Sequence, residues 1–328
     1  MKVFFSYDHS GVKMRTAKAV VCDWFTFMLS IPQTQPMSAA QKFTKWSSLL
    51  AYCVGGFSLL VCPQLWKFLL QLEFQGRTEG YLRVIGLGVF IIGFIIVIAA
   101  RSNFQDSHNV TILGSVISRL LYVNGILIML VLRNMLPLSF ALVFMALDTL
   151  LPLITLVIWF RETEGASMSL FFREVFSPIL KFRGLTSGGP IAAVFSVGIF
   201  QLFFWLIFVI RPDIAQEKLQ LDQFQAHPSG YLAAVFFTLS VHGWYHVTNA
   251  SSANHPFVPA TIFYRVALSV PVLLILRFVN QIELNLCLTL IGFDICLSIL
   301  VLILVTFSKR KISNESEERT QLTHEEKD

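Results

Sequence analysis

The chain has 328 residues, of which 55% are hydrophobic and 14% are charged, and its mean hydropathy is +0.67. This composition excludes an ordinary soluble globular domain. The formal net charge of +5 does not indicate nucleic-acid binding, because the basic residues lie beside apolar segments, where membrane topology accounts for them. The apolar runs are continuous, whereas a transmembrane barrel would alternate. We therefore expect an all-α, polytopic membrane protein.

The first 45 residues hold several lysines and arginines around one short apolar run, from Ala19 to Ile31. This run is too short to span a bilayer and contains Asp23 and Trp24. It predicts an interfacial helix within a cytoplasmic N-terminal segment, residues 1–45.

Eight later runs are apolar over the length of about 20 residues that a membrane-spanning helix needs. We expect spans at residues 46–66, 81–100, 110–132, 138–160, 190–210, 231–249, 258–278 and 284–307. A cytoplasmic amphipathic linker, residues 161–189, separates the first four spans from the last four. The polar composition of residues 309–328 predicts a disordered cytoplasmic tail.

The two sets of four spans share landmarks in the same order. Gly80-Tyr81-Leu82 returns as Gly230-Tyr231-Leu232, and Gly93 returns as Gly243. We therefore predict two four-helix repeats, residues 46–160 and 190–308. Because four spans is an even number, both copies enter the membrane the same way up, as parallel repeats.

Lysine and arginine are more frequent on the side that carries both termini, which predicts cytoplasmic termini. Residues 170–183, within the linker on that side, mix bulky apolar and basic side chains. They predict a helix that contacts anionic lipid at the cytoplasmic leaflet, or one that is simply packed against the bundle.

Two arginine–aspartate pairs lie inside apolar spans. Arg119 precedes Asp148 by 29 residues, and Arg265 precedes Asp294 by the same distance. Each pair is centred on a polar turn, so that both members lie level, about 20 Å from the turn. An isolated charge at that depth costs roughly 3 kcal/mol, which favours pairing. The pairs could form a gate, a proton relay or a head-group site, or they could be interhelical fasteners.

The expected helix 231–249 is unusually polar. His242 and His246 are four residues apart and share a face, and they could contact substrate, relay protons or ligate a metal or haem. They could equally be buried histidines bonded to Asp294, Tyr245 or the backbone. His255 is the only further histidine nearby, and no metal motif accompanies them, so we predict no metal site and leave the cofactor open.

Aromatic residues near the span ends are interpreted as interfacial anchors. They are Trp46, Trp66, Trp159, Tyr52 and Tyr81. No nucleotide-binding or hydrolase motif is present in the sequence.

Each half resembles the small four-helix integral membrane proteins of bacterial type, some of which are grouped as DoxX-like. The features that carry the resemblance in the first half are Gly-Tyr-Leu, a mid-helix glycine, Ala99-Ala100-Arg101, Arg119 and Asp148. Ser251 replaces Arg101 in the second half. The resemblance implies a four-helix unit and transfers no known site.

These patterns favour a non-enzymatic transporter or binding protein for a small or lipid-like molecule, with the bilayer as its surroundings. We expect its site at the repeat interface, formed by His242, His246, Arg265 and Asp294 with Arg119 and Asp148 opposite. The alternatives are a membrane-embedded lipid-modifying or redox enzyme that uses the histidines, and a structural scaffold.

Overall fold

The computed structural model describes the backbone of residues 36–101, 108–182, 189–221, 227–251 and 257–325. Side chains are described in the same ranges, except at residues 108–109, 227–228 and 305–325. The described backbone forms helices and turns and contains no strand, as the sequence predicts. The chain divides into Met1–Pro32 and Gln33–Asp328, and the expected interfacial helix falls outside the described residues.

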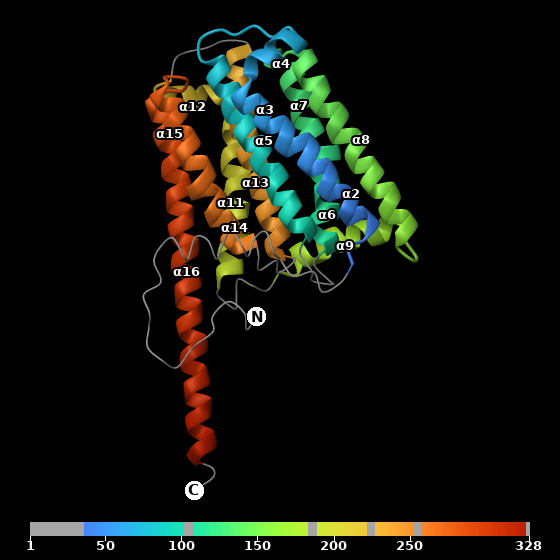
Figure 1. Ribbon diagram of the computed structural model, residues 1–328, viewed down its shortest axis with the longest axis vertical. Coiled ribbons are helices and arrows are strands. Elements are labelled where there is room, and N and C mark those ends of the chain that lie inside the picture. Colours follow the sequence, from blue (N-terminus) through green and yellow to red (C-terminus); the bar gives the residue numbers. More distant parts are fainter. Residues whose placement is uncertain (1–35, 102–107, 183–188, 222–226, 252–256, 326–328) are drawn as a thin grey trace. The chain divides into compact units, whose positions relative to one another are not determined.

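The helices of the second unit follow one another with short connections (Figure 1). The first group comprises α2 (Ala39–Ser47), η1 (Ser48–Val54), α3 (Gly55–Val61), α4 (Pro63–Leu70), α5 (Thr78–Arg101), α6 (His108–Ile117), η2 (Ser118–Val123), α7 (Asn124–Leu132) and α8 (Leu138–Glu162). After α9 (Met168–Leu180) the second group comprises α11 (Pro190–Ile210), α12 (Pro212–Lys218), α13 (His227–Ser251), α14 (Phe257–Phe263), η3 (Tyr264–Ser269), α15 (Val270–Phe278) and α16 (Leu284–Glu325). The η segments are π-helical and continue the helices on either side.

Six helical stretches among the described residues are long and apolar enough to cross a membrane. The helix 39–61 together with α4 forms a seventh if the pair, which is bent by 100°, counts as one span. This is the architecture of a multi-pass integral membrane protein. The expected span at 231–249 forms a helix, α13, but its histidine, serine and threonine residues keep it out of the six.

The first helix begins and ends earlier than residues 46–66. It starts at Ala39, where Ser38 and Gln41 form a reciprocal capping box, and it ends at Val61. Pro63 then begins α4, because proline lacks an N–H to donate but fits the first turn of a new helix. Pro212 begins α12 in the same way.

The tail also differs from expectation. The sequence predicts disorder over residues 309–328, whereas α16 continues as a helix to Glu325. Its polar extension is rich in glutamate, lysine and arginine and contains neither glycine nor proline, so helix propensity outweighs the lack of apolar residues.

Helices α5 and α13 lie side by side in the middle of the bundle (Figure 1). Nearly every side chain of α5 between Thr78 and Ala100 is buried. Helix α13 packs closely against α11, because Gly198 and Gly243 face each other's backbone and a methyl group on either would overlap the other helix. Two central helices are thus covered by helices from both groups.

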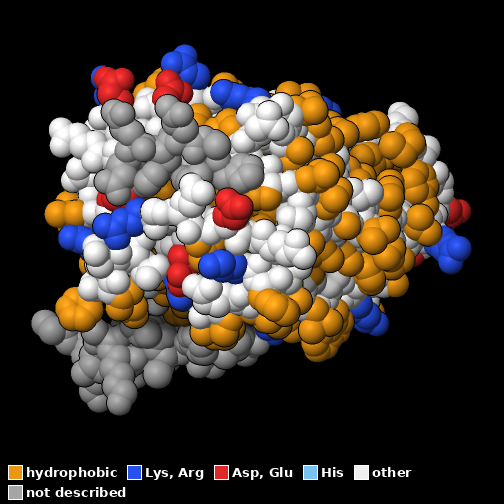
Figure 2. All heavy atoms as spheres, turned by 90° about the horizontal axis from the view of Figure 1, so that it is seen from above, with side chains coloured by type: hydrophobic (Ala, Val, Ile, Leu, Met, Phe, Trp, Pro, Cys, Tyr) orange, Lys and Arg blue, Asp and Glu red, His pale blue; other side chains and the backbone are white. Residues whose placement is uncertain are grey.

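Charged and apolar side chains are distributed differently over the molecule. Figure 2 looks onto the end where α4 and α12 lie; charged side chains occur there in small groups of both signs, and hydrophobic side chains cover much of the flank. At this end Arg83 pairs with Glu79, and Arg211 pairs with Asp213. The exposed hydrophobic flank is the surface that a lipid-facing bundle requires.

Candidate functional site

Two clusters of polar side chains are buried inside the bundle. The Arg119 cluster consists of Ser48, Tyr52, Ser118, Arg119, Asp148 and Tyr245. The Arg265 cluster consists of Gln201, His242, His246, Tyr264, Arg265 and Asp294. Because buried charge is costly in an apolar bundle, both clusters need an explanation in structure or function.

Three π-helical segments position these clusters. Segment η1 carries Tyr52, η2 carries Arg119 and η3 carries Arg265. The carbonyls of Arg119 and Arg265 both accept the backbone N–H of the residue five positions later, which is the π-helical bond. π-Helical turns are rare and are frequently found at functional sites.

In the Arg119 cluster the aspartate is bonded to a tyrosine and not to the arginine. The hydroxyl of Tyr52 donates a hydrogen bond to Asp148 Oδ1. The Nε of Arg119 lies 3.7 Å from the same oxygen, and its guanidinium stacks over the Tyr52 ring at 4.4 Å. Arg119 also donates a long, 3.4 Å hydrogen bond to Ser48. Its ion pair is therefore loose.

In the Arg265 cluster the ion pair is tight. Arg265 Nη1 lies 2.6 Å from Asp294 Oδ1, and Nη2 donates to Gln201 Oε1 at 2.9 Å. Nη2 also lies 3.3 Å from His246 Nε2. Helices α11, α13, η3 and α16 are joined at one point by these bonds.

The hydrogen-bond partners assign the tautomers of both histidines. His246 Nδ1 must donate, because its partner at 2.6 Å is the carbonyl of His242. Its Nε2 therefore accepts, from the Tyr264 hydroxyl at 2.9 Å. His242 Nε2 donates to the carbonyl of Gly88 in α5 at 3.0 Å. Both imidazoles are neutral in this arrangement, which agrees with the interpretation as bonded buried histidines.

A metal site gains no support from these contacts. Within the described ranges, no group of three or more His, Cys, Asp or Glu side chains could hold a metal ion. His255, the third histidine considered from the sequence, lies outside the described residues.

Two cavities flank the central helices. The larger, of about 60 Å³, lies between α5, α13, α7 and α8 beside the Arg119 cluster. The smaller, of about 30 Å³, lies between α5, α13, α15 and α16 and reaches His242 and Asp294. Holding one water requires roughly 10–15 Å³ on this measure, so each cavity has room for a few small groups.

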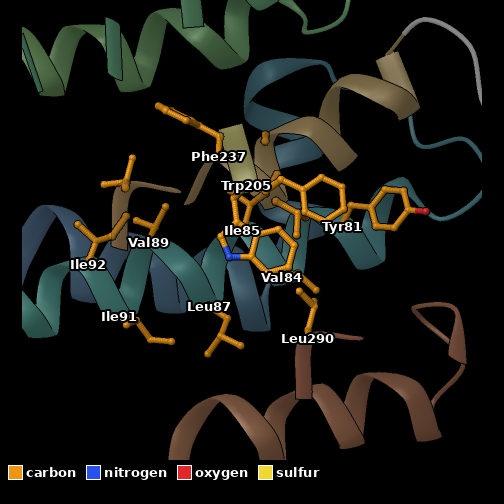
Figure 3. Packing of buried hydrophobic residues seen from close by; sticks show 14 of the residues in the cluster. Tyr81, Val84, Ile85, Leu87, Val89, Ile91, Ile92, Trp205, Phe237 and Leu290 are labelled. Carbon is orange, nitrogen blue, oxygen red and sulfur yellow. The ribbon is translucent and has the colours of Figure 1, made fainter. Parts of the chain in front are cut away.

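Helix α5 lines both cavities with different stripes of its surface (Figure 3). The first stripe, Val84, Leu87 and Ile91, points toward Leu290 of α16 and lines the smaller cavity. The second stripe consists of Ile85, Val89 and Ile92 and lines the larger cavity. Helix α13 contributes to both clusters in the same way, since its adjacent residues Tyr245 and His246 belong to different clusters.

The six site residues named from the sequence are all buried, and they lie in two groups. His242, His246, Arg265 and Asp294 come together, and the Arg265–Asp294 pair forms as the spacing predicts. Arg119 and Asp148 lie in the other cluster, where their ion pair also forms. Among the described side chains, no hydrogen bond or ion pair joins the first group to the second, and α13 passes between the two clusters.

The positions of several aromatic and polar residues differ from what the sequence predicts. Tyr52 was interpreted as an interfacial anchor but is 6% exposed and bonded to Asp148, and Tyr81 and Trp159 are buried as well. Gln201 and Tyr264 attracted no attention. The spacing to proline indicates that Gln201 and Tyr52 occupy corresponding positions in the two halves: Tyr52 lies 11 residues before Pro63, and Gln201 lies 11 residues before Pro212.

Fold and site together define a multi-pass helical membrane protein with two buried, ionic polar clusters beside internal cavities. Comparison with protein-family models, with curated proteins and with solved structures gives no match to this chain. Any assignment of function therefore depends on the chain's own geometry.

Proposed function

We propose that this chain is a transporter or binding protein for a small or lipid-like molecule, held between two parallel four-helix repeats that cross the membrane eight times. In this proposal both termini are cytoplasmic, following the lysine and arginine bias of the loops. The repeats are units of the DoxX-like kind.

Backbone geometry supports the two repeats. Left-handed residues end corresponding helices: Gln71 (φ 52°) after α4 and Gln220 (φ 51°) after α12. Asn134 (φ 53°) and Asn280 (φ 57°) likewise end α7 and α15. Left-handed non-glycine residues are uncommon, so two matched pairs in the same order favour duplication over coincidence.

Contacts between the halves are reciprocal, which supports a parallel arrangement. Gly80 of α5 lies against the carbonyl of Gln281, in the turn before α16. Gly230 of α13 lies against the carbonyl of Met135, in the turn before α8. Each half thus inserts its glycine into the other half's turn, as an axis along the membrane normal would produce.

The eighth span in this proposal is α13. It has 25 residues, and α5, its counterpart, has 24. Its polar side chains face the two clusters and the cavities instead of lipid, so that α13 avoids the free-energy cost of exposing polar groups to the hydrocarbon. Polar residues that face a bundle interior commonly mark ligand or ion pathways.

The observation that carries the functional proposal is the larger cavity. Apolar side chains from both halves form most of its wall, and a buried ion pair with two tyrosines forms one part of it. The wall residues are Ile85, Val89, Ile92, Val123, Leu127, Phe140, Phe144, Ala234, Phe237, Thr238 and Val241. An apolar wall with a few convergent polar groups is typical of a small-molecule site.

The test is to extract what co-purifies with the full chain. Leu127 lines the larger cavity and Leu273 the smaller, so the double variant Leu127→Trp/Leu273→Trp fills both. Leu132→Trp, at a side chain that is 78% exposed, is the matched control. Mass spectrometry of organic extracts is expected to find one enriched molecule with the wild type and the control and to lose it with the double variant. Identical extracts from all three proteins would refute the proposal.

A structural scaffold is the second candidate, favoured by the tight ion pair of the Arg265 cluster. A fastener needs no ligand, so a scaffold would lose stability on substitution of Arg265 and retain no enriched molecule in any variant. An enzyme that uses His242 and His246 has less support, because both rings are engaged with carbonyl or tyrosine partners. Metal and haem analysis of the purified protein separates this alternative from the others.

We also propose that α9 contacts anionic lipid. Phe171 and Val175 are buried against the bundle, whereas Phe172 is 44% exposed beside exposed Arg173 and Lys181. Exchanging both basic residues for glutamate is expected to lower the phosphatidylserine that co-purifies relative to phosphatidylcholine. Lys67→Glu/Lys218→Glu, at the other end, is the control; an equal effect of both pairs would contradict the proposal.

A further inference from the structure

The two clusters differ most in how closely each arginine approaches its aspartate. Arg265 makes short bonds to a carboxylate and an amide oxygen. Arg119 makes no hydrogen bond to a carboxylate: its Nε lies 3.7 Å from Asp148 Oδ1. The Nε atoms of Arg119 and Arg265 are both buried without a hydrogen-bond partner, so the difference lies in the bonds to the carboxylates. Its other neighbours are hydroxyls, those of Ser48 and Tyr245. A guanidinium has five donors, so Arg119 retains capacity for another acceptor.

The cause of this difference is the tyrosine in η1. Tyr52 donates to the Asp148 oxygen that Arg119 would otherwise approach, and its ring lies under the guanidinium. At the matching place in the other cluster, Gln201 accepts from Arg265 and leaves the aspartate free to pair. The Arg265 cluster therefore contains a tight ion pair. We call the Arg119 cluster open, because its arginine and aspartate are held 3.7 Å apart.

The open cluster lines the larger cavity. Arg119, Asp148, Tyr52 and Tyr245 all contribute to that wall, whereas Arg265 does not line the smaller cavity. An arginine that has no short bond to a carboxylate and an apolar chamber of about 60 Å³ thus occur at the same place. A ligand there would place an acceptor atom toward Arg119 and its nearest few carbons against the walls, and the rest of a longer chain would extend out of the cavity between the helices.

Charge restricts the ligand further. Arg119 and Asp148 together are neutral, and the other polar groups in the wall are uncharged hydroxyls. A carboxylate or phosphate would bring an unbalanced negative charge into the bundle, which is costly in an apolar surrounding. A carbonyl or hydroxyl oxygen accepts from Arg119 without changing the balance.

We propose that the larger cavity, and not the smaller one, is the ligand site, and that it takes a neutral lipid-like molecule whose carbonyl or hydroxyl oxygen is bound by Arg119. This assignment rests on the proposed function and deepens it. The Arg265 cluster then serves as the fastener that holds α11, α13, η3 and α16 together.

The experiment is photolabelling of the full chain in nanodiscs with a diazirine-bearing twelve-carbon alcohol, followed by peptide mapping. Label is expected on α7, α8 and the stripes of α5 and α13 that line the larger cavity. It should be lost in Leu127→Trp and kept in the matched variant Leu273→Trp. Dodecanol should compete at least about tenfold better than dodecane, because a hydrogen bond to a charged group contributes tenfold or more. It should also compete better than dodecanoate, because the carboxylate brings an unbalanced negative charge into the bundle.

Arg119 is tested through Tyr52→Phe, which removes the hydroxyl that holds Asp148. The freed aspartate should pair with Arg119, and competition by dodecanol should weaken about tenfold while that of dodecane stays unchanged. The same weakening for both competitors would overturn the role of Arg119. If Leu127→Trp fails to fold, as judged by gel filtration, Leu127→Phe replaces it. The loss of label in Leu127→Phe and the labelled peptides of the wild type then show which cavity holds the ligand.

The remaining outcomes are distinct. Label on the lining of the smaller cavity, lost only in Leu273→Trp, would overturn this inference and leave the proposed function standing. Loss in both variants would equally overturn the choice of one cavity. Dodecanoate competing as well as dodecanol would overturn the neutral ligand. No saturable label on the wild type would refute the proposed function itself.

Discussion

Removing one charge from the Arg265–Asp294 pair should destabilise the protein far more than removing both. Arg265 is 1% exposed and Asp294 is 7% exposed, so neither charge can be rescued by water. Their contact is 2.6 Å, and breaking a buried pair by removing one partner costs about 3–5 kcal/mol. We therefore expect Asp294→Leu alone and Arg265→Met alone each to lower the free energy of unfolding by that amount.

The double variant Arg265→Met/Asp294→Leu leaves no buried charge. Replacing a buried pair by apolar residues is often neutral or stabilising, but here Gln201 Oε1 loses its donor, at a cost of about 1–3 kcal/mol. The double variant should therefore be less destabilised than either single variant, with a coupling energy of several kcal/mol. Arg119 and Asp148, 3.7 Å apart, should couple more weakly.

The assay is a denaturant titration of detergent-purified protein, followed by tryptophan fluorescence, for the wild type, both single variants and the double variant of each pair. A cost below about 1 kcal/mol for Asp294→Leu would refute the reasoning, because a charge left alone in the bundle would then be tolerated. So would a double variant whose cost equals the sum of the single variants.

Three further predictions concern backbone packing, topology and the histidines. Gly80→Ala and Gly230→Ala should each lower the melting temperature, because a methyl group at either position overlaps a backbone carbonyl. Gly125 has open space around it, so Gly125→Ala should leave the melting temperature unchanged or raise it. Equal melting temperatures for all three variants would contradict the reciprocal contacts. In sealed membrane vesicles whose outer face is cytoplasmic, an antibody should reach a C-terminal tag, whereas a membrane-impermeant maleimide should react with Cys62, exposed at the end of α3, only after the vesicles are opened. Access to both from the same side would contradict the topology. His246→Phe should lower the free energy of unfolding by about 1–3 kcal/mol in the same denaturant titration, because the buried hydroxyl of Tyr264 loses its acceptor. An unchanged midpoint would show that the hydrogen bond between Tyr264 and His246 is dispensable.

The sequence by itself determined which charged residues lie level with each other in the bundle. Apolar run length located most of the helices, and equal spacing from a turn placed Arg265 level with Asp294, because rise per residue is fixed along a helix. The same reasoning placed Arg119 level with Asp148. It also found the landmark positions on which the proposed duplication rests.

Only the tertiary structure decided how each helix is rotated and which neighbour its side chains meet. Tyr52 looks like an interfacial anchor in the sequence, yet the rotation of η1 turns it onto Asp148. Rotation likewise sends Tyr245 and His246, adjacent in α13, to different clusters. Whether an aspartate bonds to arginine or tyrosine depends on differences of about 1 Å between helices, because hydrogen bonds weaken steeply with distance. Such differences arise from packing against several helices at once, and no periodicity in the chain encodes them.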